Sequence, residues 1–558
     1  MKKTIHIIGS GFSSLAASCY LAKAGYNVTI FEKNKTIGGR ARQLKRDGFV
    51  FDIGPTWYWM PDVFERFFSD FNKKPSQYYA LEKLNPAYSV YYGKDDFITI
   101  EDTLEKIIKA FEKEEPGSSK KLNKFIKDAK DNYEVAIKDL VYNPGVSPLE
   151  LITPTTIKKI NQFFSTIKRD VRKEFKNERL IKILEFPVLF LGAKPSDTPS
   201  FYSFMNYADF GLGTFHPKKG MYQVILAMES LAKELGVTIK TEAPIDNIIV
   251  ENGEAKGVEY FDLKRGKKLK SIKANKEVIL SAGVINSPQI LMLTGIGAAK
   301  ELAKHHIPLV KDLPGVGENL QDHPDVIIRC SDKSNSSLTT VPKPSMLKFF
   351  ARFYRKSEHI VFTPTDAGGY IKSDASVAVP DLQLQFAPIR MFPHGTKPLT
   401  PSKAGFVLHV CHMRPKSRGN IKLKSNNPLD APIINANYFD NEFELDALVK
   451  GVKIAREILS QPAFSTMLKE EEMPGKNVVS DKEIRQFILD RVESVYHTAG
   501  SCKMGIDDMA VVDPELKVYG IKNLRVVDSS IFPTITGSNI HAPTVMIAEK
   551  AADMILNQ

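Results

Sequence analysis

Cysteine is scarce in this chain of 558 residues, which has only four. Cys19, Cys330, Cys411 and Cys502 lie far apart, and no two of them form a CxxC pair. Disulfide scaffolds and zinc sites need paired or closely spaced cysteines, so neither is expected, and the pattern fits a reducing compartment. We therefore expect no metal site and a cytoplasmic protein.

The chain also lacks a long uninterrupted apolar run. Residues 1–19 imitate a secretory signal and residues 278–299 approach the length of a membrane span, but glycines interrupt the first and polar residues at 286–289 the second. No transmembrane helix is required. A hydrophobic fraction of 43% and a charged fraction of 25% are ordinary for globular proteins and argue against disorder or a coiled coil. The length suggests roughly three folding units.

Basic residues outnumber acidic ones, with 77 Lys and Arg against 65 Asp and Glu, for a net charge of +12. Such a charge could suit nucleic acid or an anionic membrane. Because the lysines are scattered and no nucleic-acid-binding motif accompanies them, a nucleic acid partner is not expected. The segments 168–191 and 346–356 mix apolar and basic residues. Such segments could bind peripherally to the inner face of the cell membrane. Equally, their apolar side chains could be buried in the protein while their lysines reach solvent.

The first 32 residues carry a dinucleotide-binding pattern. An apolar strand over 4–8 is followed by a glycine turn, a helix over 15–24 and a second strand over 27–31, which ends on Glu32. This order of strand, turn, helix, strand and acidic residue is the context that a GxGxxG motif requires. A tight turn that binds no ligand is the alternative reading.

Four residues of this pattern are candidate cofactor ligands. Gly9 permits the tight turn, and Gly11 lets a pyrophosphate approach the backbone at the start of the helix. Ser14 stands in place of the usual third glycine. Glu32 would accept hydrogen bonds from the ribose of an adenosine.

The next residues resemble those of known flavoproteins. Gly38-Gly39-Arg40 follows the ribose acid closely, as in flavoproteins with two dinucleotide-binding motifs, so FAD is favoured over NAD, with Gly39 and Arg40 among its ligands. Together with residues 51–57 and 216–222, these motifs make the segment from residue 1 to about 258 resemble bacterial phytoene desaturases (bacterial-type carotene desaturases). That resemblance implies FAD, a long polyene substrate and peripheral membrane association.

Motifs beyond about residue 259 resemble a second family, the glucose–methanol–choline (GMC) oxidoreductases. They are the segments 277–283, 286–291, 295–297, 313–324 and 414–419. The chain therefore resembles a chimera, natural or constructed, whose halves could join near the tight turn Asn252-Gly253. A single divergent family carrying both motif sets is the alternative. The flavin-covering loop of GMC enzymes and the C-terminal motif of the desaturases are both missing.

The GMC resemblance implies the catalytic residues. The loop 496–505 makes His497 the candidate base, and His541 lies just ahead of an expected helix over 544–556. A neutral imidazole suits general-base work near neutral pH, and a helix N-terminus would stabilise negative charge on a reduced flavin. His323 is interpreted as a loop anchor.

The same resemblance implies three further FAD contacts. Asp528 follows a short strand and would bind the ribitol, and Asn539 lies in the segment that precedes the last helix. Ile245 belongs to an expected strand over 243–250 that passes the adenine.

The predicted fold is α/β, with an FAD-binding Rossmann-like domain assembled discontinuously and an inserted α+β substrate or cap region. The expected parts are the FAD domain in three pieces (1–75, 215–325 and 491–558), a cap over 76–214 and a GMC-type substrate domain over 326–490. The leading hypothesis is FAD-dependent oxidation of an alcohol, with a small or hydrophobic substrate and an unknown electron acceptor. Carotenoid desaturation and a flavin-binding protein without activity are the alternatives.

Overall fold

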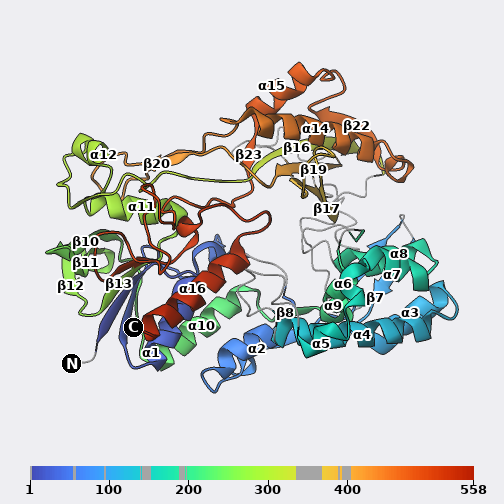
Figure 1. Cartoon of the computed structure of the whole chain (residues 1–558), viewed down its shortest axis with the longest axis horizontal. Helices are drawn as coiled ribbons and strands as arrows, with labels where there is room; N and C mark the ends of the chain where they lie inside the picture. The colour runs from blue at the N-terminus through green and yellow to red at the C-terminus, as the bar shows by residue number, and fades with distance from the viewer. Residues whose placement is uncertain are drawn as a thin grey trace.

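The structure is a computed structural model, which describes residues 3–53, 58–92, 96–138, 140, 153–187, 195–196, 198–334, 367–387, 390–391 and 404–558. Figure 1 shows three regions: a sheet with helices around it at the lower left, a second sheet beneath two helices at the top, and a mainly helical region at the lower right.

A five-stranded parallel sheet holds the N-terminal glycine turn. Its strands run in the order β24-β13-β1-β2-β9. They are β1 (Thr4–Ile8), β2 (Asn27–Phe31), β9 (Thr238–Lys240), β13 (Glu277–Leu280) and β24 (Leu524–Val526). Because these strands come from both ends and the middle of the chain, the α/β domain is assembled discontinuously. This confirms the predicted fold class.

Four helices pack around this sheet. They are α1 (Phe12–Lys23), α10 (Tyr222–Glu234), α11 (Gly283–Leu293) and α16 (His541–Leu556). Helix α1 contacts both α10 and α16, which joins the first residues of the chain to its last (Figure 1). It begins three residues earlier than predicted, and Gly25, in the left-handed region at φ +93°, follows its end.

A three-stranded antiparallel sheet lies next to the parallel one. It consists of β10 (Ile245–Glu251), β11 (Glu254–Asp262) and β12 (Lys268–Lys273). Asn252 and Gly253 both have positive φ, 53° and 72°, which confirms the expected tight turn between β10 and β11. The buried Ile245 belongs to the hydrophobic core that this sheet shares with the parallel one.

The second large sheet has six strands. The order is β17-β18-β19-β16-β22, and β23 also pairs with β16. The strands are β16 (Pro324–Asp332), β17 (Ala367–Ile371), β18 (Leu382–Ala387), β19 (Gly405–His412), β22 (Leu468–Met473) and β23 (Glu493–Ser494). Every second residue on one face, such as Leu384 and Leu408, packs in an apolar core with α14 (Glu442–Leu459) and α15 (Asp481–Arg491).

The helical region contains most of residues 81–217. Its elements are β5 (Leu81–Lys83), β6 (Tyr88–Tyr91), β7 (Phe97–Ile100), α3 (Leu104–Glu114), α4 (Ser118–Lys138), α5 (Pro154–Ile157), α6 (Asn161–Phe164), α7 (Ile167–Glu174), α8 (Glu178–Glu185), η6 (Ser200–Ser203), α9 (Phe204–Asn206), the π-helical η7 (Tyr207–Leu212) and β8 (Phe215–Pro217).

One of the two segments considered for membrane binding has buried apolar residues. Leu180, Ile181 and Leu184 are buried in the core of the helical region, so α8 packs inside the protein and does not offer this face to a membrane. The second segment, 346–356, lies outside the described residues. In the part of the chain that the structure describes, we find no helix long and apolar enough to cross a bilayer.

The remaining elements are short. They are η1 (Gly39–Ala41), β3 (Gln43–Arg46), β4 (Phe49–Asp52), α2 (Pro61–Ser69), η2 (Pro75–Gln77), η8 (Leu263–Arg265), β14 (Ile296–Gly297), α12 (Ala299–Lys304), β15 (Lys311–Asp312), β20 (Asn420–Lys422), β21 (Ile433–Asn435), η9 (Pro462–Phe464) and η10 (Ser529–Ile531).

Candidate active site

The glycine turn is built as a cradle at the start of α1. Gly9 has φ +104°, and a Cβ on it would collide with the backbone carbonyl of Ser281, so only glycine fits. Gly11 is the N-cap of α1, and a Cβ there would meet no protein atom within 4 Å. The space beside Gly11 is therefore open at the point where a helix N-terminus would receive a phosphate.

Two further residues of the predicted set adjoin this cradle. A Cβ on Gly39, which has φ +55°, would lie 3.3 Å from the Cα of Gly11, so the diglycine turn touches the first glycine turn. Ser14 lies in the first turn of α1, and its buried hydroxyl has no hydrogen-bond partner. An open cradle with an unpaired hydroxyl fits a bound dinucleotide.

Glu32 is held in place at the end of β2. One carboxylate oxygen accepts from the Ser10 hydroxyl at 2.6 Å, and the other accepts from the backbone N–H and the side-chain amide of Asn34, at 2.8 and 2.6 Å. Ser10 itself belongs to the glycine turn. The acid is thus pre-oriented next to the cradle, as a ribose ligand would need to be.

Arg40 joins the N-terminal turn to the C-terminal histidine loop. Its guanidinium donates to the backbone carbonyl of Tyr496 at 3.3 Å and to the Ser529 hydroxyl at 3.4 Å. Asp528, next to Ser529, is buried and accepts hydrogen bonds from the backbone N–H of Gly283 and the hydroxyl of Ser287, at 2.9 and 2.6 Å. The cradle and the histidine loop are therefore neighbours in space.

His497 stands at the centre of a hydrogen-bonded cluster. Its Nδ1 lies 2.9 Å from Nδ1 of His323, and the two rings meet edge to face. Its Nε2 lies 3.3 Å from the side-chain amide nitrogen of Asn539. If the Asn539 amide donates to Nε2, the ring proton of His497 sits on Nδ1 and is donated to His323. Nε2 then carries no proton, and its single lone pair accepts from the Asn539 amide in this structure.

The carboxylate of Asp322 organises both histidines. One of its oxygens accepts from the backbone N–H of His323 at 2.9 Å and from that of His497 at 3.1 Å. The other accepts from the hydroxyl of Tyr438 at 2.6 Å. Asp322 therefore fixes the backbone from which each ring projects.

The sequence analysis did not assign His323 to the site. His323 is fully buried, and its contact with His497 makes it more than a loop anchor, which corrects that interpretation. Its position beside Asp322 in a GMC-like motif was the signal that could have pointed to it. No sequence motif pointed to Tyr438.

Both rings are electrically neutral near neutral pH. Burial and, to a smaller extent, the positive charge of Arg40 lower the pKa of His497 to about 4. Burial and the neighbouring His497 lower the pKa of His323 to about 3. A neutral His497 has the protonation state that a general base needs.

The remaining predicted residues lie at the edges of this cluster. Ile245 begins β10 within the core of the dinucleotide domain. His541 is the first residue of α16, three positions earlier than the expected helix, and its side chain is outside what the structure describes. Figure 1 shows α16 running from the centre of the molecule along α1.

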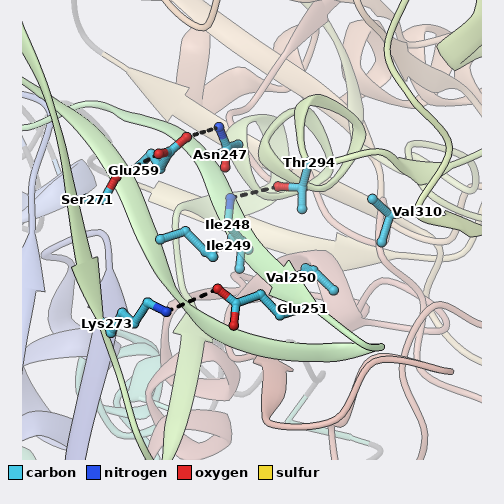
Figure 2. A pocket seen from close by; sticks show the side chains of 10 residues that line it. All are labelled: Asn247, Ile248, Ile249, Val250, Glu251, Glu259, Ser271, Lys273, Thr294 and Val310. Atoms are coloured by element: carbon cyan, nitrogen blue, oxygen red, sulfur yellow. Dashed lines mark hydrogen bonds and ion pairs between the residues drawn. The ribbon is translucent and has the colours of Figure 1, made fainter.

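A hollow of about 450 Å³ over the three-stranded sheet is not this site. Figure 2 shows that its polar side chains are directed at one another. Glu259 accepts from Asn247 and Ser271 at 2.9 and 2.6 Å, and Lys273 pairs with Glu251 at 3.2 Å. With these groups already paired, the hollow carries no chemistry.

Comparison with known proteins agrees with this arrangement. Residues 204–325 and 415–548 match two sequence patterns described as GMC oxidoreductase, and residues 7–73 match a pattern described as an NAD(P)-binding Rossmann-like domain. The first GMC match begins at residue 204, well before the boundary near 258 that the motifs predicted. None of these three patterns is specific to carotene desaturases.

Curated relatives include two alcohol-oxidising enzymes. The chain is 40% identical over 324 residues to an "Alcohol dehydrogenase [acceptor]" of Pseudomonas putida, which is 57% of this chain and 58% of that protein. It is 39% identical to the mitochondrial choline dehydrogenase of Homo sapiens over 354 residues, 62% of this chain and 58% of that protein. The matches thus span little more than half of each relative's length.

Solved structures resemble nearly the whole chain at low sequence identity. A pyridoxine 4-oxidase superposes with a TM-score of 0.60 at 17% identity, covering 99% of both chains. A fungal aryl-alcohol oxidase superposes with a TM-score of 0.58 at 17% identity, covering 100% of this chain and 99% of that one. The chain therefore has the α/β fold of these structures, and two of its segments match GMC oxidoreductase patterns after an N-terminal segment that matches a Rossmann-like pattern.

Proposed function

We propose that this protein is an FAD-dependent oxidoreductase that oxidises an alcohol with His497 as the general base. The observation that carries the proposal is the cluster around His497. A neutral, half-buried imidazole is held by His323 on one side and Asn539 on the other, next to the arginine that follows the diglycine turn. The alcohol-oxidising relatives support the same reaction class.

The residues at the N-terminal turn fit FAD. Gly11 leaves room for the pyrophosphate beside the tight turns at Gly9 and Gly39, the unpaired hydroxyl of Ser14 can donate, and Glu32 would bind the ribose. Toward the histidine loop, Arg40, Asp528 and Asn539 would hold the rest of the cofactor, and Ile245 would lie by the adenine. When bound, FAD supplies the acceptor for a hydride.

The protein's own part in the reaction is to hold the alcohol and take up its proton. A substrate hydroxyl that took the place of the Asn539 amide at His497 Nε2 would give its proton to that nitrogen, and the carbinol hydrogen would leave as hydride. The alcohol thereby loses two electrons and two hydrogens and becomes a carbonyl. His323 accepts from Nδ1 and keeps the ring in the required tautomer.

Anaerobic titration tests this function. We expect the flavin spectrum of the purified protein to bleach with members of a panel of primary and secondary alcohols and to stay oxidised with phytoene in liposomes. Bleaching by phytoene alone would replace the proposal with desaturation, and bleaching by neither would indicate a flavin-binding protein without this activity.

The acid limb of the pH profile should depend on Arg40. Below its pKa the His497 imidazole is protonated and cannot accept a proton, so kcat/KM should fall on acidification with a midpoint near 4, the pKa of His497. Because Arg40 lowers this pKa, Arg40→Met should move the limb to higher pH, whereas Arg40→Lys, which keeps the charge, should move it less. Stopped-flow flavin reduction from pH 3 to 8 measures the limb in the wild type and in both variants. An unchanged limb in Arg40→Met would contradict the electrostatic coupling.

Peripheral binding to an anionic membrane remains part of the proposal, on a different surface from the two predicted segments. Three exposed apolar side chains lie in and between α5 and α6 at helical spacing. They are Ile157, Ile160 and Phe164, which are 54%, 51% and 82% exposed. Exposed Lys158 and Lys168 flank them. Apolar side chains bordered by lysines suit the interface of an anionic bilayer.

Changing Ile157, Ile160 and Phe164 together to serine should abolish co-sedimentation with phosphatidylserine vesicles at low salt. The control variant Ile506→Ser, at a position 88% exposed, should bind as the wild type does. Binding should weaken as salt screens the charges. Equal binding of the triple variant and the wild type would rule out this surface.

A further inference from the structure

The loop 436–441, between β21 and α14, brings a tyrosine to the catalytic cluster. The hydroxyl of Tyr438 donates to Oδ2 of Asp322 at 2.6 Å, although the two residues are 116 positions apart. Asp322 precedes β16, whereas Tyr438 precedes α14. This hydrogen bond therefore connects the approach to α14 with the acid that holds the backbone of both histidines.

The backbone on both sides of Tyr438 is left-handed. Asn437 has φ +51° and Phe439 has φ +64°. Asparagine adopts this region readily, but a bulky residue such as phenylalanine does so rarely and at a cost in energy. Residues of this kind persist where their surroundings hold them, and they cluster at functional sites. The loop thus accepts strain in the shape that delivers the tyrosine hydroxyl.

Contacts at both ends and in the middle hold the loop in this shape. The side-chain amide of Asn437 donates to the backbone carbonyl of Arg418 at 2.9 Å. The backbone N–H of Asn441 donates to the hydroxyl of Ser417 at 3.0 Å. Between these anchors, Phe439 packs against the apolar core beneath α14. The tyrosine between the anchors is therefore fixed in place.

The Tyr438 hydroxyl can serve Asp322 only as a hydrogen-bond donor. Burial and the carboxylate of Asp322 raise the pKa of Tyr438, so the hydroxyl keeps its proton and does not compete with His497 as a base. A phenol has one proton, and this one is already donated to Asp322.

The buried carboxylate of Asp322 depends on its donors. It is 5% exposed, and its other oxygen accepts from the backbone N–H groups of His323 and His497, at 2.9 and 3.1 Å. The hydroxyl of Ser494 also hydrogen-bonds to it. A carboxylate removed from water needs such bonds to compensate for lost hydration. Without the Tyr438 hydroxyl, it would be held less firmly against the backbone N–H of His497.

We propose that Tyr438 is a positioning residue, which acts on the base through Asp322. It holds the carboxylate, the carboxylate holds the backbone N–H of His497, and this fixes the direction in which the imidazole projects. The inference rests on the proposed oxidation of alcohols with His497 as the base. Because the effect passes through the peptide of His497, it should exist only while the imidazole is attached to that peptide.

Free imidazole supplied to His497→Ala makes this testable, because it is not attached to the backbone that Asp322 holds. Tyr438→Phe removes only the hydroxyl. In the wild type it should lower the limiting rate of alcohol-dependent flavin reduction by about tenfold, as expected for a lost hydrogen bond to a charged group. In His497→Ala with imidazole, the same change should lower the rate by less than about twofold. If imidazole restores no rate, the residual rate of His497→Ala serves for the comparison.

Tyr20→Phe is the matched control. It removes another tyrosine hydroxyl that donates to an aspartate, Asp70, at 2.8 Å near the end of α1, and it should change neither rate. The flavin absorbance and the melting temperature show whether Tyr438→Phe keeps its cofactor and fold.

The comparison has clear adverse outcomes. An equal loss in both backgrounds would overturn the proposal, since the tyrosine would then act on the fold, the cofactor or the substrate and not through the base. An unchanged rate in Tyr438→Phe would overturn it as well. Flavin reduction of the wild type by no alcohol at all would instead overturn the proposed function.

Discussion

Replacing His497 by alanine should leave FAD bound and lower the rate of alcohol-dependent flavin reduction by about 10²–10⁴-fold, the range for loss of a general base. The loss is expected in the chemical step, because His497 Nε2 is the proposed acceptor of the hydroxyl proton. Rapid mixing of the reconstituted protein with an alcohol under anaerobic conditions measures it directly.

Three further measurements show whether the loss of rate in His497→Ala comes from the missing base or from a disturbed fold. Added imidazole should restore part of the rate in His497→Ala, since it can occupy the space of the missing ring. His541→Asn should cost much less, because asparagine still donates a hydrogen bond. His6→Ala removes a buried histidine of β1 that packs on Phe31, and it reports the cost of losing a buried ring alone. A His6→Ala loss as large as that of His497→Ala would show that the fold, not the base, was disturbed.

The same variant discriminates between the two enzyme classes. A polyene offers no hydroxyl proton, so a desaturase would lose little activity in His497→Ala beyond the effect of an altered cavity. Alcohol oxidation that survived the substitution undiminished would remove the proposed mechanism. A large loss with phytoene as the substrate would show that His497 has a different role.

The second large effect is expected at Gly11. Gly11→Val should yield a folded but colourless protein, with FAD affinity lowered by at least about 3 kcal/mol, more than a hundredfold in Kd. The backbone at Gly11, φ −71° and ψ 179°, is a conformation that valine tolerates, and a Cβ there meets no protein atom within 4 Å. The added methyl groups would therefore collide only with a bound cofactor. Absorbance at 450 nm after purification measures the FAD that remains bound. The melting temperature of the apoprotein measures whether the fold is retained.

Gly9→Ala provides the contrast. Its Cβ would run into the carbonyl of Ser281 at a residue with φ +104°, so this variant should lose FAD together with stability. A Gly11→Val protein that remained fully yellow would contradict the assignment of the N-terminal turn. A Gly11→Val protein that lost stability as Gly9→Ala does would mean that the space beside Gly11 is needed by the fold itself.

Local patterns in the sequence predicted the elements that depend on neighbouring residues. The strands over 4–8 and 27–31 have the predicted bounds, because an apolar run between turn residues specifies a buried parallel strand. The turn at Asn252-Gly253 has the expected positive φ angles, since few other residues adopt them. GMC-like motifs also pointed to His497 as the candidate base.

Only the tertiary structure decided which distant residues meet. His323 and His497 are 174 positions apart, and Arg40 and Tyr496 are 456 apart, so no periodicity in the sequence could bring them together. The sequence of α8 also could not decide its environment, because its apolar and basic residues suit either a membrane surface or a core. Its burial depends on the helices around it. Short-range sterics in the sequence determined the glycine turn, and short motifs pointed to His497 as the candidate base. Long-range packing brought His323, Asn539 and the charge of Arg40 to that histidine.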